Sequence, residues 1–139
     1  MIIVDTSVLS LAFRRSSWPN DEMPSVVRLL RKLTREKEHL GVPGVVLQEL
    51  LSGVKDLTQG ERIKALMEGY PLLLATKEHH VEAANISNVC RRGGVSAATI
   101  DCLIAAQCIM LDGLLLTMDD DFKRISKCCG LRLYPIPVD

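Results

Sequence analysis

The sequence predicts a single α/β domain in three layers, in which a central parallel sheet of about five strands lies between helices. Short apolar runs alternate with longer segments whose apolar residues recur at helical spacing, which is the pattern of strands connected by helices. The chain has 139 residues, of which 47% are hydrophobic, so it is long enough to bury one substantial core. We therefore expect residues 1–139 to form one domain.

The predicted elements follow one another along the chain. Residues 1–4 (MIIV) form an unbroken apolar run rich in β-branched residues, as expected of a strand buried on both faces. A helix is predicted after Asp5, because Thr6 and Ser7 are capping residues, and residues 16–25 have turn composition. Further helices are expected at about 25–38, 44–55, 61–70, 77–90, 96–111 and 119–127, and further strands at 39–43, 71–76, 114–117 and 131–136.

Composition narrows the classes of function. Lysine plus arginine equals aspartate plus glutamate, 17 each, so contacts with nucleic acid would depend on a local basic patch rather than on a basic coat. Aromatic residues make up only 4% of the chain, which disfavours a surface that binds single strands mainly by stacking. No apolar run approaches the ~20 residues of a membrane helix, and the N-terminal segment lacks a basic leader. We expect a cytoplasmic protein without a membrane segment.

The five cysteines agree with that compartment. Their number is odd, and none of them has the C-x-x-C spacing of a zinc site. They are interpreted as reduced thiols, with Cys102 and Cys108 in an apolar run that belongs to the core. The adjacent Cys128 and Cys129 invite a redox role, for which the sequence alone offers no support.

Four carboxylates fall where loops converge at one edge of the predicted sheet. Asp5 directly follows the first strand, and Asp119 closely follows the strand 114–117. Glu49 lies early in the helix after the second strand, and Asp101 lies early in the very apolar helix 96–111. Because sites in open α/β sheets form outside the carboxyl ends of the strands, we expect these four side chains to reach one rim.

Such a cluster needs neutralisation, because neighbouring carboxylates raise one another's pKa. Mg²⁺ and Mn²⁺ prefer oxygen ligands, and in such a site they activate water and neutralise a scissile phosphate. Asp101 is the most telling member, since a charge in so apolar a helix needs a partner or an ion. Taken singly, Asp5 could equally be a helix cap and Glu49 a solvated helix residue. Together, the four predict metal-dependent hydrolysis of phosphodiesters.

With these residues in place, the chain resembles the PIN domains, and in particular the VapC-type toxins of prokaryotic toxin–antitoxin pairs. The match runs nearly from end to end of the chain and includes the stretches MIIVDTSVL, GVVLQELLSG, SAATIDCLIAAQC and LLLTMDDDFKRI. The resemblance implies a three-layer α/β fold with a parallel sheet and an acidic metal site. The aspartate at position 120 departs from the common T-x-D-x-D-F ending, where this place is variable.

The resemblance also implies roles for individual residues. The family's four acidic positions fall on Asp5, Glu49, Asp101 and Asp119, which would be catalytic and would bind the metal. The supporting hydroxyls would be Thr6 and Thr117. The implied activity is Mg²⁺- or Mn²⁺-dependent endoribonuclease cleavage of an RNA substrate. The implied partners are a small VapB-like antitoxin, whose tail blocks the acidic groove, and a second copy of the chain in a homodimer.

Basic residues at helix ends and turns are candidates for guiding RNA to the acidic site. The candidates for such contacts are Lys123, Arg124, Arg14 and Arg91. Lys123 and Arg124 stand out because they follow Asp119 closely in the sequence. The alternative is that these charges simply solvate helix faces and helix C-termini.

The run of three aspartates at 119–121 is predicted to divide its roles, because adjacent side chains on a helix or strand point in different directions. Asp119 is the expected ligand, Asp121 favours the start of the last helix, and Asp120 faces solvent. An EF-hand is excluded, since its sixth and twelfth loop positions would be Arg124 and Gly130. A haloacid-dehalogenase-like phosphatase would need an aspartate at position 7, where Ser7 stands.

One alternative remains open, a non-catalytic PIN-like module that binds RNA or a partner protein. The four filled acidic positions argue against it, because a purely structural fold gains nothing from uncompensated carboxylates.

Overall fold

The computed structural model describes residues 1–15, 17–19 and 21–139. Over these ranges the elements follow in the order β1 (Ile2–Val4), α1 (Thr6–Phe13), α2 (Ser25–Arg35), β2 (Leu40–Pro43), α3 (Gly44–Ser52), α4 (Leu57–Met67), β3 (Leu72–Leu73), α5 (Lys77–Arg92), α6 (Thr99–Met110), β4 (Leu114–Leu116) and α7 (Asp121–Ser126). Ser16 and Asn20, which belong to the predicted turn segment 16–25, lie outside the described residues.

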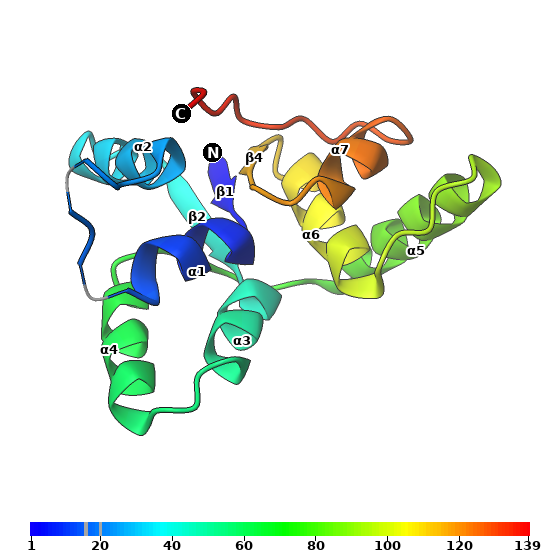
Figure 1. The fold of residues 1–139 in the computed structure, drawn as a ribbon. Helices are drawn as coiled ribbons and strands as arrows, with labels where there is room; N and C mark the ends of the chain where they lie inside the picture. The colour runs from blue at the N-terminus through cyan, green and yellow to red at the C-terminus, as the bar shows by residue number, and fades with distance from the viewer. Residues whose placement is uncertain (16, 20) are drawn as a thin grey trace.

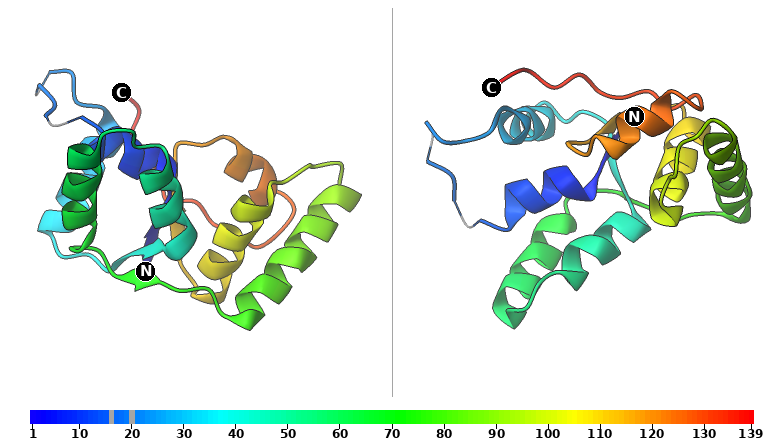
Figure 2. Two further views of the ribbon diagram at one scale, coloured as in Figure 1. Left: turned by 90° about the horizontal axis from the view of Figure 1, so that it is seen from below. Right: turned by 45° about the vertical axis from the view of Figure 1, so that its right-hand side comes forward.

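The sheet is parallel and has the strand order β3-β2-β1-β4. Its central strand β1 is apolar and buried, and Ile3 pairs with Leu115 while Val4 pairs with Leu116. Helices α1 to α4 gather on one side of the sheet, and α5 to α7 lie on the other (Figures 1 and 2). This arrangement confirms the predicted three-layer α/β architecture with a parallel sheet.

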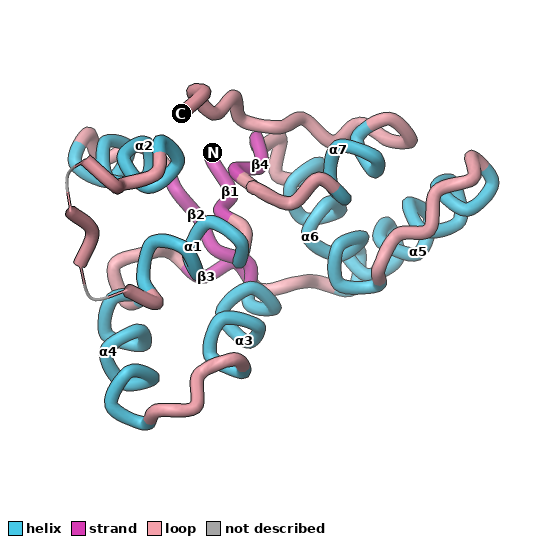
Figure 3. The backbone as a smooth tube through the Cα atoms, viewed as in Figure 1, coloured by secondary structure: helices cyan, strands magenta, loops and turns pink. Residues whose placement is uncertain are grey.

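The number of strands was predicted as about five and is four in the described chain. The predicted last strand, 131–136, forms only a single bridge, between Leu115 and Leu133, and otherwise runs as a loop along β4 (Figure 3). Two hydrogen bonds hold it there, from Leu115 N to Arg132 O (2.9 Å) and from Tyr134 N to Leu115 O (2.8 Å). Pro135 and Pro137 follow at once. Because proline has no N–H to donate, the ladder ends there.

The helix predicted at 61–70 begins earlier, at Leu57. Asp56 caps it, since its Oδ1 accepts a hydrogen bond from the backbone N–H of Thr58 (2.9 Å). An N-cap of this kind satisfies one of the free donors of the first turn and allows the helix to start there. The prediction missed this start because Gly60 interrupts the helical pattern.

Buried side chains hold in place the two helices that flank the end of β4. Helix α6 is buried without interruption from Cys102 to Cys108, and its contacts with α5 are the most extensive between any two elements. Phe122 and Ile125, each 1% exposed, anchor the short helix α7. Burial therefore fixes α6 and α7 against the core beside the end of β4. None of the helices within the described ranges is long and apolar enough to cross a membrane.

Candidate metal centre

The four predicted acidic residues meet at the carboxyl edge of the sheet. Asp5 directly follows β1, and its backbone N–H donates to Leu116 O of the neighbouring strand β4 (3.0 Å). Asp119 lies in the turn between β4 and α7, Glu49 lies on α3, and Asp101 lies in the first turn of α6. Strand ends and helix starts reach the same rim because the strands are parallel.

Three carboxylates in particular come together at this rim. Asp101, Asp119 and Asp121 each offer one oxygen, and these oxygens lie within 4.8 Å of one another. In the part of the chain that the structure describes, this is the only group of three or more such side chains with ligand atoms so close. Carboxylate oxygens at this spacing fit the ligand preference of Mg²⁺ or Mn²⁺. The residues present therefore suit a hard divalent cation.

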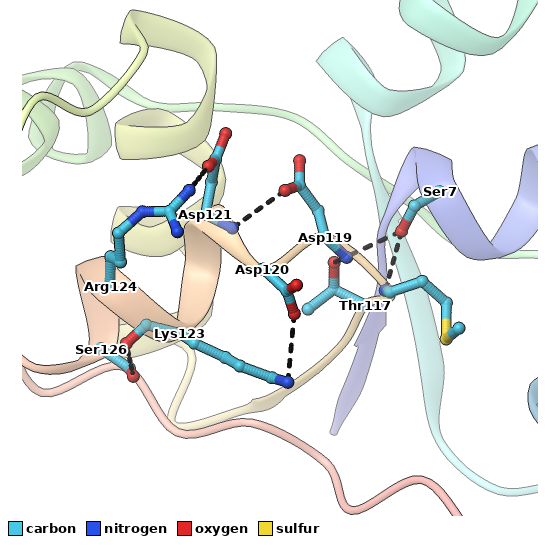
Figure 4. A network of polar contacts seen from close by, with 9 residues as sticks. Ser7, Thr117, Asp119, Asp120, Asp121, Lys123, Arg124 and Ser126 are labelled. Atoms are coloured by element: carbon cyan, nitrogen blue, oxygen red, sulfur yellow. Dashed lines mark hydrogen bonds and ion pairs between the residues drawn. The ribbon is translucent and has the colours of Figure 1, made fainter.

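Asp121 is the member of this group that sequence reasoning did not assign to the metal. It is the first residue of α7, as expected, but Asp119 Oδ1 accepts a hydrogen bond from its backbone N–H (2.9 Å). This bond curls the chain into an Asx turn, so that the carboxylates of Asp119 and Asp121 lie on the same side (Figure 4). The expected directions of successive side chains apply to regular helices and strands, and they do not hold in a turn. The spacing of two residues is the signal that would have found Asp121.

Asp120 behaves as the sequence suggested. Its side chain is 74% exposed and lies away from the other two aspartates, where it forms an ion pair with Lys123 Nζ at 3.1 Å (Figure 4). An exposed pair of this kind contributes little to stability. Asp120 therefore offers a matched carboxylate against which changes at positions 119 and 121 can be compared.

Asp5 is the most buried carboxylate of the site, at 4% exposure. Its Oδ2 accepts hydrogen bonds from Thr117 Oγ1 (2.7 Å) and from Ser7 Oγ (2.8 Å). The two hydroxyls also accept from the turn, Thr117 from the N–H of Asp119 (3.0 Å) and Ser7 from the N–H of Met118 (2.9 Å) (Figure 4). The start of α1 and the turn after β4 are thus joined through Asp5. Ser7 was not predicted as a site residue.

Glu49 reaches the site from α3 and is held by the hydroxyl that follows Asp5. Thr6 Oγ1 donates a hydrogen bond to Glu49 Oε1 at 3.0 Å. Thr6 and Thr117 therefore each donate a hydrogen bond to one of the predicted carboxylates. Asp5 and Thr6 are adjacent at the junction of β1 and α1. This junction therefore contacts both the turn after β4, through Thr117, and Glu49 on α3.

The neighbouring carboxylates also affect the titration of Asp101. Burial, and then the charges of Asp119, Asp5, Asp121 and Glu49 in that order, together raise the pKa of Asp101 to about 6. Such repulsion is the condition that a bound divalent cation relieves.

This pKa leads to a prediction about stability in a metal-free buffer with chelator. Asp101 has an ordinary pKa of 3.8 and a folded-state pKa of about 6, so between these values the folded chain binds more protons than the unfolded chain. Its contribution to stability is therefore lost as pH rises from about 4 to about 6. We expect Asp101→Asn to raise the melting temperature at pH 7.5 relative to the unsubstituted protein, and to do so much less at pH 4.5. Melting curves by circular dichroism at both pH values test this, and equal shifts at the two would contradict it.

The four basic candidates differ in how they relate to the site. Arg124 forms an ion pair with Asp121, and Lys123 pairs with Asp120 (Figure 4). Arg14 donates to Leu50 O (3.4 Å) and lines a groove of about 400 Å³ that Ser7 also lines. The candidates Lys123, Arg124 and Arg14 therefore flank the acidic rim.

Arg91 lies elsewhere. Its Nη1 donates to Asn88 on the same helix (3.1 Å), and its side chain lines a cavity of about 400 Å³ between α5 and α6. None of the four predicted acidic residues lines this cavity. The structure thus does not bring Arg91 together with the other basic candidates.

Together, the parallel sheet and the carboxylates at its edge define an α/β domain with an acidic site suited to a divalent metal. The chain belongs to the PIN-domain family, whose sequence profile matches residues 2–127. The resemblance of its sequence motifs to PIN domains is thereby confirmed.

Known proteins of similar sequence cover nearly the whole chain. The VapC ribonuclease Mb1587 of Mycobacterium bovis and the ribonuclease VapC11 of Mycobacterium tuberculosis are each 29% identical to it over 134 residues, or 95% of this chain and 96% of the relative.

Solved structures share the fold at lower identity. FitAcB of Neisseria gonorrhoeae aligns with a TM-score of 0.74 at 20% identity, over 97% of both chains. VapBC2 of Rickettsia felis, solved with a DNA fragment from its promoter, aligns with a TM-score of 0.76 at 19% identity, over 96% of this chain and 98% of the other. At these identities, the structural likeness concerns the fold.

Proposed function

We propose that this protein is a metal-dependent endoribonuclease and acts as the toxin of a VapBC-type toxin–antitoxin pair. The observation that carries the proposal is the convergence of Asp101, Asp119 and Asp121 at the carboxyl edge of a PIN-domain sheet, with their oxygens within 4.8 Å of one another. The names of the relatives, which are VapC ribonucleases, support RNA as the substrate.

The carboxylates divide between holding the metal and organising its surroundings. Asp101, Asp119 and Asp121 would hold Mg²⁺ or Mn²⁺. Asp5 would help to position them, because its Oδ2 accepts hydrogen bonds from Ser7 and from Thr117, which in turn binds the N–H of Asp119. When bound, the ion neutralises charge on the scissile phosphate and lowers the pKa of a bound water. Glu49, whose carboxylate is held by Thr6, would orient the attacking water or bind a second metal.

Two grooves beside the rim offer a path for RNA despite the net charge of zero. Arg14, Arg15 and Trp18 line one groove together with Ser7. Lys123 and Tyr134 line the other, of about 460 Å³, together with Asp119. Cationic side chains next to aromatic rings suit the phosphates and bases of a single strand. These local side chains would contact RNA without a basic charge spread over the whole surface.

The relatives also suggest the partners. Several structural neighbours are solved as VapBC or toxin–antitoxin complexes, so we infer a small VapB-like antitoxin that blocks the acidic groove. We further propose a homodimer and a cytoplasmic location, which the reduced cysteines of the described chain fit.

Titration with Mn²⁺, followed by calorimetry, tests the metal centre before any RNA target is known. We expect saturable binding to the unsubstituted protein, and binding weakened at least about tenfold by Asp5→Asn, because this carboxylate supports the ligands. A parallel assay with a mixed RNA pool should give cleavage that requires Mn²⁺ or Mg²⁺ and stops with a chelator.

The same experiment distinguishes a metal-dependent nuclease from a non-catalytic module with the same fold. Mn²⁺ binding that Asp5→Asn leaves unchanged, together with RNA that stays intact, would favour a non-catalytic module that binds RNA or a partner protein. Cleavage of RNA that persists with chelator present would contradict the proposed metal dependence.

A further inference from the structure

Helix α2 carries a row of positive charges that the proposed nuclease site does not use. One face of this helix is buried in the core through Val26, Val27, Leu30 and Leu33. The opposite face is exposed, and its cations recur at intervals of three and four residues, which places them side by side along the helix. They are Arg28, Arg31, Lys32 and Arg35, and we refer to these four side chains as the α2 cation row.

Little in the described chain neutralises this row. Arg28 pairs with Asp139, with 3.7 Å between Nη2 and Oδ1. Among the residues that the structure describes, no ion pair involves Arg31, Lys32 or Arg35. Helix α2 contains no aspartate or glutamate, whereas α4, α5 and α7, the other described helices with two or more cations, each contain at least one. Like charges at these intervals destabilise a helix, so the fold by itself gains nothing from the row.

The helix dipole accounts for only part of the row. Lys32 and Arg35 lie in the last turn, where cations are favourable because the free carbonyl groups carry partial negative charge. Arg28 is the fourth residue of this helix and Arg31 the seventh, so the dipole offers neither of them that advantage. A negatively charged partner, in contrast, would account for all four cations.

The segment after α7 forms one wall of a groove at the metal centre. Tyr134, Pro135 and Ile136 line this groove of about 460 Å³, and Asp119 lines it too. Tyr134 is half-buried, and an aromatic ring beside apolar side chains suits a base of a single strand. An RNA strand bound at the metal centre would therefore have a path along this segment.

The same segment continues to the start of α2. Ser25 Oγ donates a hydrogen bond to Pro137 O (2.7 Å), and the N–H of Ser25 donates to Asp139 Oδ1 (2.6 Å). Figures 1 and 2 show the segment reaching α2. Residues 134–139 span at most about 18 Å when fully extended, and Asp139 contacts Arg28 directly. The Arg28 end of the row therefore lies within about 25 Å of the groove.

We propose that the α2 cation row binds the phosphates of single-stranded RNA that extends from the metal centre along residues 134–139. The inference rests on the proposed function for the identity of the polyanion. Three of the four cations are arginines, whose planar guanidinium groups bind phosphate through two parallel hydrogen bonds. Contacts of this kind position the strand without reading its sequence. The row would thus hold RNA beyond the nucleotides that flank the scissile phosphate.

The surroundings of the row favour RNA over the other common polyanions. A helix that binds a membrane surface inserts an apolar face into the lipid, but the apolar face of α2 is buried in the core. An acidic polypeptide would satisfy the charge alone, whereas RNA also explains why the row adjoins a groove that Asp119 and Tyr134 line together.

Fluorescence anisotropy with a labelled oligouridylate of about 20 nucleotides tests the row on the full chain, with chelator present to prevent cleavage. The variant combines Arg31→Gln, Lys32→Gln and Arg35→Gln. We expect its affinity at about 0.1 M salt to be at least about tenfold weaker than that of the unsubstituted protein. The slope of log affinity against log salt should become shallower by about 2, because each phosphate contact on a single strand contributes about 0.7.

The matched control combines Lys55→Gln, Lys77→Gln and Arg92→Gln, which removes the same charge from exposed side chains on other elements. Its affinity should stay within about twofold of the unsubstituted protein, because salt screens distant charges. Circular dichroism of both variants checks that the fold is retained. The proposal is overturned if the two variants weaken RNA binding equally, or if the α2 variant changes neither affinity nor slope. It is also overturned if the α2 variant loses binding to polyglutamate while its affinity for RNA is unchanged.

Cleavage of a mixed RNA pool with Mn²⁺ separates this inference from the proposed function. The α2 variant should need about tenfold more RNA to reach half of its maximal rate, with the maximal rate unchanged, since the row contributes binding and not chemistry. Equal RNA requirements for the α2 variant and the unsubstituted protein would refute the row while the nuclease stands. RNA that binds through the row but is never cleaved would support the row and contradict the nuclease.

Discussion

Asp101→Asn is expected to lower metal-dependent cleavage of RNA by about a thousandfold or more, with the fold retained. Loss of a partner that only supports a metal ligand costs ten- to a hundredfold, and Asp101 belongs to the three-carboxylate group itself. Asparagine has nearly the same shape and keeps one oxygen, but it carries no charge to attract the cation. The rate with Mn²⁺ on a defined RNA and the affinity for Mn²⁺ should therefore fall together.

Stability in the absence of metal separates this effect from misfolding. Removing the Asp101 charge relieves repulsion from its neighbours, so the inactive variant should melt higher than the unsubstituted protein at neutral pH. Adding Mn²⁺ should raise the melting temperature of the unsubstituted protein and leave that of the variant nearly unchanged. A well-folded Asp101→Asn protein that still cleaves RNA with Mn²⁺ at a comparable rate would exclude Asp101 from the metal site.

The second large effect concerns the three consecutive aspartates. We expect Asp119→Asn to reduce cleavage by at least about a hundredfold, and Asp121→Asn by about ten- to a hundredfold. Asp121 is more exposed and already paired with Arg124, so its contribution should be the smaller. Asparagine at position 119 still has an oxygen to accept the N–H of Asp121, which preserves the turn.

Asp120→Asn provides the comparison for both variants. It removes the same charge from the same turn, but from a side chain that faces Lys123 rather than the carboxylate group. Its cleavage rate should stay within about twofold of the unsubstituted protein, because an exposed pair is largely screened. If Asp120→Asn were as damaging as Asp119→Asn, the effect would come from total charge and not from ligand position. If Asp121→Asn were neutral, Asp121 would not be a ligand.

The sequence was sufficient for the alternation of strands and helices and for the edge at which the site lies. The strand at MIIV and the apolar helix 96–111 can each be predicted from the pattern of apolar residues within the segment itself. Asp5 and Asp119 follow their strands directly, so parallel pairing alone brings them to one rim. The prediction of a last strand at 131–136 was wrong for a reason that is also local, since Pro135 and Pro137, which end the pairing, are visible in the sequence.

The contacts within the site could not be predicted in the same way. Ser7 donates to Asp5 and accepts from Met118, a residue at the other end of the chain. Asp121 joins Asp101 and Asp119 because a hydrogen bond closes the turn between them. Both features depend on distances between atoms that periodicity does not encode.

The sequence by itself therefore determined the α/β class, the parallel sheet and the four acidic residues at its carboxyl edge, because hydrophobic period and strand ends are properties of neighbouring residues. Only the tertiary structure decided which oxygens lie within reach of one cation and which hydroxyls hold Asp5. Those outcomes require segments distant in the chain to be packed at contact distance, and packing is set by the whole core rather than by any single segment.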